Sequence, residues 1–180
     1  VEIRRVDPRL LPRLFGVVRQ TSQLLERSVR DNLALGIDPA PSDERMRAAL
    51  TAVRMHELGS ASGERDLGTA YRKNPPNFSG GEHRRLLMAR MLVQDAPVCV
   101  LDEPEAGLPS GTAEDILETV VAQAEGRTHL VVTHAPHLLA SDFNLVLDRG
   151  RLVARGKHEE LVQSSEIYRE LLADALKEGL

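Results

Sequence analysis

Cysteine and aromatic residues are scarce in this sequence, and each scarcity limits what the protein can be. A single cysteine, Cys99, excludes an internal disulfide bond, and its place in an apolar run predicts a buried side chain. Tryptophan is absent and only 3% of residues are aromatic, so the core must consist of leucine, valine, isoleucine and alanine. No apolar run approaches the ~20 residues of a membrane span, and no signal peptide is recognisable. We therefore expect any membrane role to come through a partner.

Length and charge are those of an ordinary soluble, globular protein. At 180 residues the chain is long enough for one domain with a sizeable core. Its formal net charge of −4 offers no electrostatic reason to bind nucleic acid, whose affinity rests mainly on lysine and arginine at phosphates. A basic cluster at residues 83–85 does not change that balance. We expect no nucleic-acid partner.

Apolar periodicity and helix-breaking residues divide the first half of the chain. Alternation over residues 1–6 predicts a short strand, and residues 14–18 form a second apolar segment. Residues 24–35 suit a loop that enters a short helix. Ser42 is a candidate N-cap for a helix that continues to about residue 58. The Gly-, Ser-, Asn- and Pro-rich residues 59–77 predict a long surface connection.

From residue 80 onward, apolar runs alternate with amphipathic segments. This alternation indicates an α/β fold with a mainly parallel sheet that is covered by helices on both faces. A turn with glycine near the end of the chain predicts a β-hairpin. The predicted helices are 81–94, 111–125, one from 158 and one over 165–177, and the predicted strands are 98–101, 130–133, 145–148 and 151–154.

Two adjacent carboxylates, Asp102 and Glu103, are the strongest candidates for chemistry. They follow four apolar residues of a predicted buried strand and precede Pro104. In α/β sheets, the carboxyl ends of parallel strands face the crevice that binds ligands. Hydrolysis of a nucleotide needs an oxygen ligand for Mg²⁺, which suits Asp102, and a group that orients or deprotonates water, which suits Glu103. The alternative is that both residues merely end a strand beside a turn.

A glycine-flanked serine opens the helix predicted after residue 80. Residues 77–82 read Asn-Phe-Ser-Gly-Gly-Glu. The glycines let backbone N–H groups approach a phosphate closely, the helix start adds a partial positive charge, and Ser79 can donate a hydrogen bond. The alternative is a glycine-rich helix start in which Ser79 is an ordinary N-cap. Alone, the motif is weak evidence for phosphate binding. Its spacing along the sequence from Asp102 and Glu103 argues against a coincidence.

Together the two motifs resemble the signature motif and the Walker B motif of the ATP-binding cassette (ABC) ATPases. In that family two cassettes face each other head to tail, and each ATP lies between one Walker A motif and the opposite signature motif. The resemblance implies that Asp102 binds Mg²⁺ and that Glu103 is catalytic. It also implies nucleotide binding by the signature residues, which are Ser79, Gly80, Gly81 and Glu82.

Two further segments join this resemblance. Residues 17–20 look like the Q-loop of the family, which would give Gln20 a contact with Mg²⁺ and with the attacking water. Residues 131–134 look like the strand and switch histidine, which would place His134 at the γ-phosphate. In isolation, His134 would more simply cap a strand. A metal site built from His134 and His137 is less favoured still, because no further ligands lie nearby in the sequence.

The subfamily that the chain resembles is that of exporter-type cassettes. Residues 24–36 and 148–161 look like the corresponding segments of exporters, and the resemblance runs from residue 1 to about residue 176. It implies a second cassette as a homo- or heterodimer partner, a transmembrane domain, and a place at the cytoplasmic face of the plasma membrane. It divides the chain into a helical and signature region, about 37–95, and a catalytic-core remainder, 1–36 and 96–180.

The sequence also departs from the family. The phosphate loop G-x-x-x-x-G-K-[ST], or Walker A motif, occurs nowhere in the 180 residues. Glu82 replaces the commoner glutamine, Pro109 replaces the usual aspartate of the D-loop (residues 105–109), and residues 72–76 replace a Gly-Glu-x-Gly pattern. We therefore expect a fragment or degenerate cassette that binds nucleotide poorly alone. Apolar faces left uncovered would make it marginally stable or self-associating.

Three functions are compatible with these motifs. The first is the ATP-binding and hydrolysing domain of an exporter, with the phosphate loop lying outside this sequence. The second is a non-hydrolysing interaction module that offers its signature motif to a partner cassette. The third is a soluble ABC-class ATPase of DNA repair or translation, which the exporter-like segments and the acidic balance disfavour. The exported substrate is not visible, because membrane domains select it.

Overall fold

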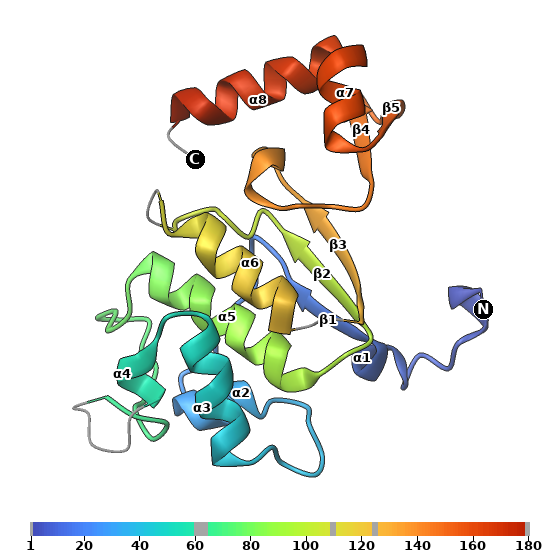
Figure 1. Ribbon diagram of the computed structural model, residues 1–180. Helices are drawn as coiled ribbons and strands as arrows, with labels where there is room; N and C mark the ends of the chain where they lie inside the picture. The colour runs from blue at the N-terminus through green and yellow to red at the C-terminus, as the bar shows by residue number, and fades with distance from the viewer. Residues whose placement is uncertain (1, 60–64, 109–110, 124–125, 179–180) are drawn as a thin grey trace.

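The computed structural model describes residues 2–59, 65–108, 111–123 and 126–178, and Figure 1 shows how their elements are arranged. A parallel sheet lies beside α5 and α6 in the larger part of the molecule, and a hairpin with two helices forms a smaller C-terminal part. In chain order the elements are η1 (Ile3–Arg5), α1 (Leu11–Leu14), β1 (Phe15–Val18), α2 (Val29–Leu33), α3 (Asp43–Ala52), α4 (His56–Gly59), α5 (Gly80–Gln94), β2 (Val98–Asp102), α6 (Ala113–Gln123), β3 (Thr128–Val132), η2 (Pro136–Leu138), β4 (Asn144–Asp148), β5 (Arg151–Gly156), α7 (His158–Ser164) and α8 (Glu166–Glu178).

Parallel pairing in the order β1–β2–β3 brings three strand ends to one edge of the sheet. Val18 pairs with Leu101, and Asp102 pairs with Val132. The segments that follow these residues therefore leave the sheet side by side. This arrangement confirms the prediction of an α/β fold with a mainly parallel sheet, and it defines the edge where such sheets bind ligands.

Within the described residues, helices cover one face of this sheet, so the prediction that both faces are covered is wrong. Cys99 and Leu101 are fully buried in the core cluster, which confirms the prediction for Cys99. Side chains alternate between the two faces of a strand. On the opposite face, Val17, Leu130 and Val132 are 39%, 53% and 50% exposed. An apolar surface thus lies open across two strands.

Two predictions about the first half of the chain need correction. Residues 3–5 form a single 3₁₀ turn rather than part of a strand, because no described strand lies beside them to accept the pairing. Ser42 caps α3 as predicted, with its Oγ accepting the Arg45 N–H at 3.2 Å. The predicted continuation to residue 58 is interrupted, however, because Arg54 adopts a left-handed φ of 56° before α4 begins.

The predicted surface connection over residues 59–77 is anchored at several buried side chains. Leu67 and Tyr71 are only 1% and 9% exposed. The Tyr71 ring stacks on Phe78 with 5.7 Å between centroids, and its hydroxyl lies 2.8 Å from His83 Nδ1. Residues 60–64 of this prediction lie outside the described residues. The segment therefore packs against the start of α5 instead of lying wholly on the surface.

The C-terminal part confirms the predicted hairpin and terminal helices. Strands β4 and β5 pair antiparallel, and Arg149 and Gly150 at their turn both have positive φ. Val146, Leu161 and Tyr168 form a small core of their own. In α8, Ala175 joins the main core instead, so this helix ties the two parts together. No helix in the described part of the chain is long and apolar enough to cross a membrane.

The open sheet face leads to a prediction about self-association. Threonine at positions 130 and 132 suits a strand and presents hydroxyl groups to water. We expect sedimentation velocity to show a smaller oligomer fraction for Leu130→Thr/Val132→Thr than for the unaltered chain at equal concentration. Leu176→Gln is the control, because Leu176 is 66% exposed on α8, outside the sheet. An unaltered chain that remains monomeric at every concentration would contradict this prediction.

Candidate functional site

The three predicted catalytic side chains meet at the carboxyl edge of the sheet. Gln20 Nε2 donates to Glu103 Oε2 at 2.8 Å, and Glu103 Oε1 lies 3.1 Å from His134 Nε2. These residues follow β1, β2 and β3 in turn, so the parallel register joins positions 83 and 31 residues apart. In the tautomer whose Nε2 carries the hydrogen, His134 donates to the Glu103 carboxylate in this contact. The predicted grouping exists in space, and the catalytic roles stay predictions.

The backbone at Glu103 fixes where its carboxylate points. Glu103 adopts φ of 47°, in the left-handed region that residues other than glycine rarely occupy. Its N–H still donates to the Val132 carbonyl at 2.8 Å, which anchors it beside the end of β3. Its side chain is 25% exposed and that of His134 is 71% exposed. The cluster is therefore open to solvent on the histidine side, where a ligand can reach it.

Asp102 lies at the end of β2, opposite Val132, on the open face of the sheet. The predicted Mg²⁺ ligands are its carboxylate and the amide oxygen of Gln20. In the part of the chain that the structure describes, no three His, Cys, Asp or Glu side chains gather into a metal site. Mg²⁺ is usually held by one or two carboxylates together with substrate phosphates and water. The donor set therefore fits a metal shared with a nucleotide, and this ligation stays a prediction.

A third acidic side chain, Glu105, belongs to the same edge and was not among the predicted site residues. It is only 3% exposed. Its Oε1 accepts hydrogen bonds from Thr133 Oγ1 at 2.6 Å and from the His134 N–H at 3.3 Å. The sequence signal that could have found it is a third carboxylate, just after Asp102 and Glu103, in a chain whose next strand is followed by Thr-His.

The signature residues form a capping box at the start of α5. Ser79 Oγ accepts the Glu82 N–H at 3.2 Å, and Glu82 Oε2 accepts the Ser79 N–H at 2.7 Å. Glu82 Oε1 also accepts from Arg65 Nη1 at 2.7 Å, and the Arg65 guanidinium lies 4.2 Å from the centroid of the Phe78 ring. Both carboxylate oxygens of Glu82 are thus engaged in holding the helix start. Nucleotide contacts by the signature residues stay predictions.

The turn after β2 rests against this helix start. A Cβ added at Gly81 would lie 2.9 Å from the Gly107 carbonyl oxygen, whereas one added at Gly80 would meet nothing within 4 Å. Gly107 itself has a φ of 76°. The close approach therefore requires glycine at position 81, while Gly80 is open to a ligand. Pro109, the predicted departure in the D-loop, lies outside the described residues.

Side chains of α5 also hold the segment on both sides of Gln20, residues 19–23. His83 Nε2 lies 3.1 Å from the Ser22 carbonyl oxygen, and Arg84 Nη1 donates to the Arg19 carbonyl at 3.2 Å. Arg90 Nη1 donates to the carbonyl of residue 23 at 3.3 Å. Arg84 is buried, at 7% exposed. The basic residues noted in the sequence therefore serve main-chain carbonyls inside the fold.

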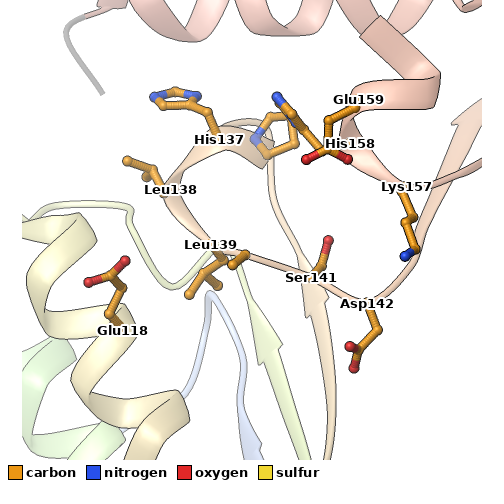
Figure 2. Close-up of a pocket in the computed structure, with 11 residues that line it drawn as sticks. Glu118, His137, Leu138, Leu139, Ser141, Asp142, Lys157, His158 and Glu159 are labelled. Atoms are coloured by element: carbon orange, nitrogen blue, oxygen red, sulfur yellow. The ribbon is translucent and has the colours of Figure 1, made fainter.

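A separate cavity of about 500 Å³ lies between α6, the loop after β3 and the start of α7 (Figure 2). Figure 2 shows Glu118, His137, Asp142, Lys157 and His158 among its lining residues. The lining includes none of the residues of the predicted nucleotide site. We place the candidate site at the sheet edge, because nucleotide hydrolysis needs the carboxylates gathered there.

Comparison with known proteins supports the resemblance seen in the motifs. The sequence profile of a family described as ABC transporter matches residues 2–106, which include Gln20, the capping box and the Glu103 carboxylate. The chain belongs to the ABC transporter family. The matched range ends before His134. The assignment of Gln20, Glu103 and His134 to the Q-loop, Walker B and switch-histidine positions stays a prediction.

Relatives within the ABC family include exporters. The chain is 37% identical over 159 residues to the glutathione/L-cysteine transport system ATP-binding/permease protein CydD of Bacillus subtilis (strain 168), covering 87% of this chain and 27% of that protein. It is 32% identical over 165 residues to the leukotoxin translocation ATP-binding protein LktB of Mannheimia glucosida, covering 91% of this chain and 23% of that protein. The structure of a bacterial Atm1-family ABC exporter with ATP bound matches with a TM-score of 0.82 and 32% identity, over 92% of this chain and 29% of that one. The chain therefore has the fold of an ABC exporter cassette and spans about a quarter of the length of these relatives.

Replacement of glycine by alanine should change the stability of this ABC chain differently at Gly80 and at Gly81. In Gly81→Ala the new Cβ meets the Gly107 carbonyl, and we expect the free energy of unfolding to fall by about 1–3 kcal/mol. Gly80→Ala is the matched control in the same helical turn, because its Cβ meets open space. Alanine there should be neutral or stabilise by up to about 1 kcal/mol. Urea unfolding measures the difference, and equal stabilities would contradict the close approach.

Glu82 makes the stability of this cassette depend on pH. Burial alone would raise the pKa of Glu82, but hydrogen bonds from the Ser79 N–H and Arg65 outweigh burial and hold it below its usual 4.5. A lowered folded-state pKa contributes stability above the unfolded value that is lost as pH falls through the folded value. We therefore expect the melting temperature to fall less steeply below pH 4.5 in Glu82→Gln than in the unaltered chain.

The control for this pH series is Glu114→Gln, which changes an exposed carboxylate on α6. Its melting temperature should follow that of the unaltered chain at each pH. If Glu82→Gln loses stability below pH 4.5 as steeply as the unaltered chain does, the hydrogen bonds to Glu82 do not lower its pKa.

Proposed function

We propose that this chain contributes to ATP hydrolysis in an exporter-type ABC transporter. The observation that carries the proposal is the position of Glu103, whose two carboxylate oxygens contact Gln20 and His134 at the carboxyl edge of the sheet. Two relatives are named as ATP-binding proteins of transport or translocation systems, and the matched structure is an exporter with ATP bound. These names support transport over DNA repair or translation.

Each side chain at the sheet edge would have a separate task in the reaction. Glu103 would orient the attacking water and accept its proton, with Gln20 holding one carboxylate oxygen in place. His134, whose ring is largely exposed, would turn its Nε2–H toward the γ-phosphate. Asp102 and Gln20 would hold Mg²⁺. When bound, this ion would neutralise the charge that develops on the phosphate oxygens.

The start of α5 would bind phosphate in a second ATP site. The first N–H groups of a helix lack partners within the helix, and the helix dipole favours an anion there. Ser79 Oγ accepts from the Glu82 N–H, which leaves the hydroxyl hydrogen of Ser79 to donate to a phosphate oxygen. Because Gly80 faces open space, a ligand can approach the backbone at this point.

The proposed sites require partners. The 180 residues hold no G-x-x-x-x-G-K-[ST] sequence, so we propose that a phosphate loop outside them completes each site. A second cassette, identical or different, would face the signature residues. A transmembrane domain would place the assembly at the cytoplasmic face of the membrane and select the exported substrate.

One observation favours a second candidate function. The capping box at the signature motif is fully formed in a sequence that holds no phosphate loop. Such a chain could offer Ser79 and Gly80 to the phosphate loop of a partner cassette without hydrolysing ATP itself. This candidate predicts ATP binding only in the presence of an intact partner cassette.

Hydrolysis by the full-length protein that carries this chain distinguishes the two functions. We expect Glu103→Gln to lower the kcat for ATP by about 100-fold or more with little change in KM, because the substitution removes the proton acceptor. Glu114→Gln, on the surface of α6, serves as the control and should leave turnover unchanged. Turnover that survives Glu103→Gln would contradict the proposed role of Glu103. Binding of ATP without turnover, seen only when an intact partner cassette is present, would favour the interaction module.

A further inference from the structure

Glu105 is a buried carboxylate to which the proposed reaction gives no task. It lies two residues after Glu103 in the turn that follows β2, and it is 3% exposed. Burial of an ionisable side chain is costly unless hydrogen bonds compensate for the lost water. Its Oε2 is buried and has no hydrogen-bond partner within the described residues, so only one of its oxygens is compensated. The contacts of the other oxygen therefore indicate what the residue does.

Those contacts all lead to the loop that carries His134. Oε1 accepts from Thr133 Oγ1 at 2.6 Å and from the His134 N–H at 3.3 Å. Thr133 Oγ1 in turn accepts the Ala135 N–H at 2.9 Å. One carboxylate thereby restrains three consecutive residues at the point where β3 ends.

The restraint matters because the His134 ring has little support of its own. Its side chain is 71% exposed, and its Nε2 lies 3.1 Å from Glu103 Oε1. An exposed side chain with one hydrogen bond has several rotamers within reach unless its backbone is fixed. We propose that Glu105 is a positioning residue that holds the His134 backbone so that the imidazole Nε2–H points at Glu103.

A positioning role differs in its consequences from a role in stability. Glu105→Leu fills a similar volume but removes the acceptor of two hydrogen bonds, and a buried donor left without its acceptor destabilises the fold. Glu105→Leu should therefore lower the melting temperature modestly and release the His134 loop, whereas a purely structural role would leave the His134 imidazole unaffected. Glu105→Gln retains a side-chain carbonyl that can accept both hydrogen bonds, so it should rescue the loop.

Nitrogen NMR of the histidine side chains tests this inference on the 180-residue chain. The ¹⁵N shifts of Nδ1 and Nε2 report which nitrogen carries the hydrogen. We expect the unaltered chain and Glu105→Gln to show His134 protonated at Nε2, and Glu105→Leu to show shifts averaged over both tautomers. The His134 amide should exchange with solvent about tenfold faster or more in Glu105→Leu, as expected when an amide loses its hydrogen-bond acceptor.

Two further variants make the outcome decisive. Thr133→Val removes the other side of the contact and should also speed exchange at the His134 amide, even if Glu105→Leu fails to fold. Glu118→Leu, which removes an exposed carboxylate of α6, should leave the His134 signals unchanged. Unaltered His134 tautomer and exchange in Glu105→Leu, or in Thr133→Val if Glu105→Leu does not fold, would overturn the inference.

The inference deepens the proposed function, because His134 matters only if the sheet edge is the reacting site. The NMR measurement needs neither ATP nor a partner. A negative NMR result would therefore leave hydrolysis through Glu103 intact, whereas loss of the proposed function would appear only in the turnover of Glu103→Gln.

Discussion

Parallel pairing of β1, β2 and β3 is the constraint from which the candidate site follows. The pairing places the ends of three strands at one edge, so Gln20, Glu103 and His134 meet although they are far apart in the sequence. Burial holds this register, because Cys99 and Leu101 have no exposed surface. A slip of β2 by one residue would turn both side chains to the open face and move Asp102 to the covered one. The apolar core thus determines the positions of the polar groups.

The regular elements of this fold were largely visible in the sequence, whereas the contacts between them were not. A continuous apolar run predicts β2, and the glycine-flanked serine predicts where α5 begins. The strand predicted from alternation over residues 1–6 was wrong, because a strand also needs a neighbouring strand to pair with. The break at Arg54 depends on a left-handed backbone at an arginine, for which no residue type in that stretch gives a signal.

The candidate site shows the same division. Glu103 was predicted from its place after a buried strand, whereas Gln20 and His134 were predicted from the resemblance to the ABC family. Motifs did not reveal Glu105, because its importance comes from burial beneath the loop of the next strand. For Ser79 the two interpretations of the sequence are compatible. The hydroxyl oxygen caps the helix while its hydrogen stays available to a ligand.

The hydrogen bonds from α5 to residues 19–23 determine which substitutions this segment can tolerate. His83, Arg84 and Arg90 reach main-chain carbonyl oxygens, a group that every amino acid provides. These three contacts therefore do not depend on the side chains of residues 19, 22 and 23. Substitutions at residues 19, 22 and 23 should leave the path of this loop, and with it the position of Gln20, largely unchanged.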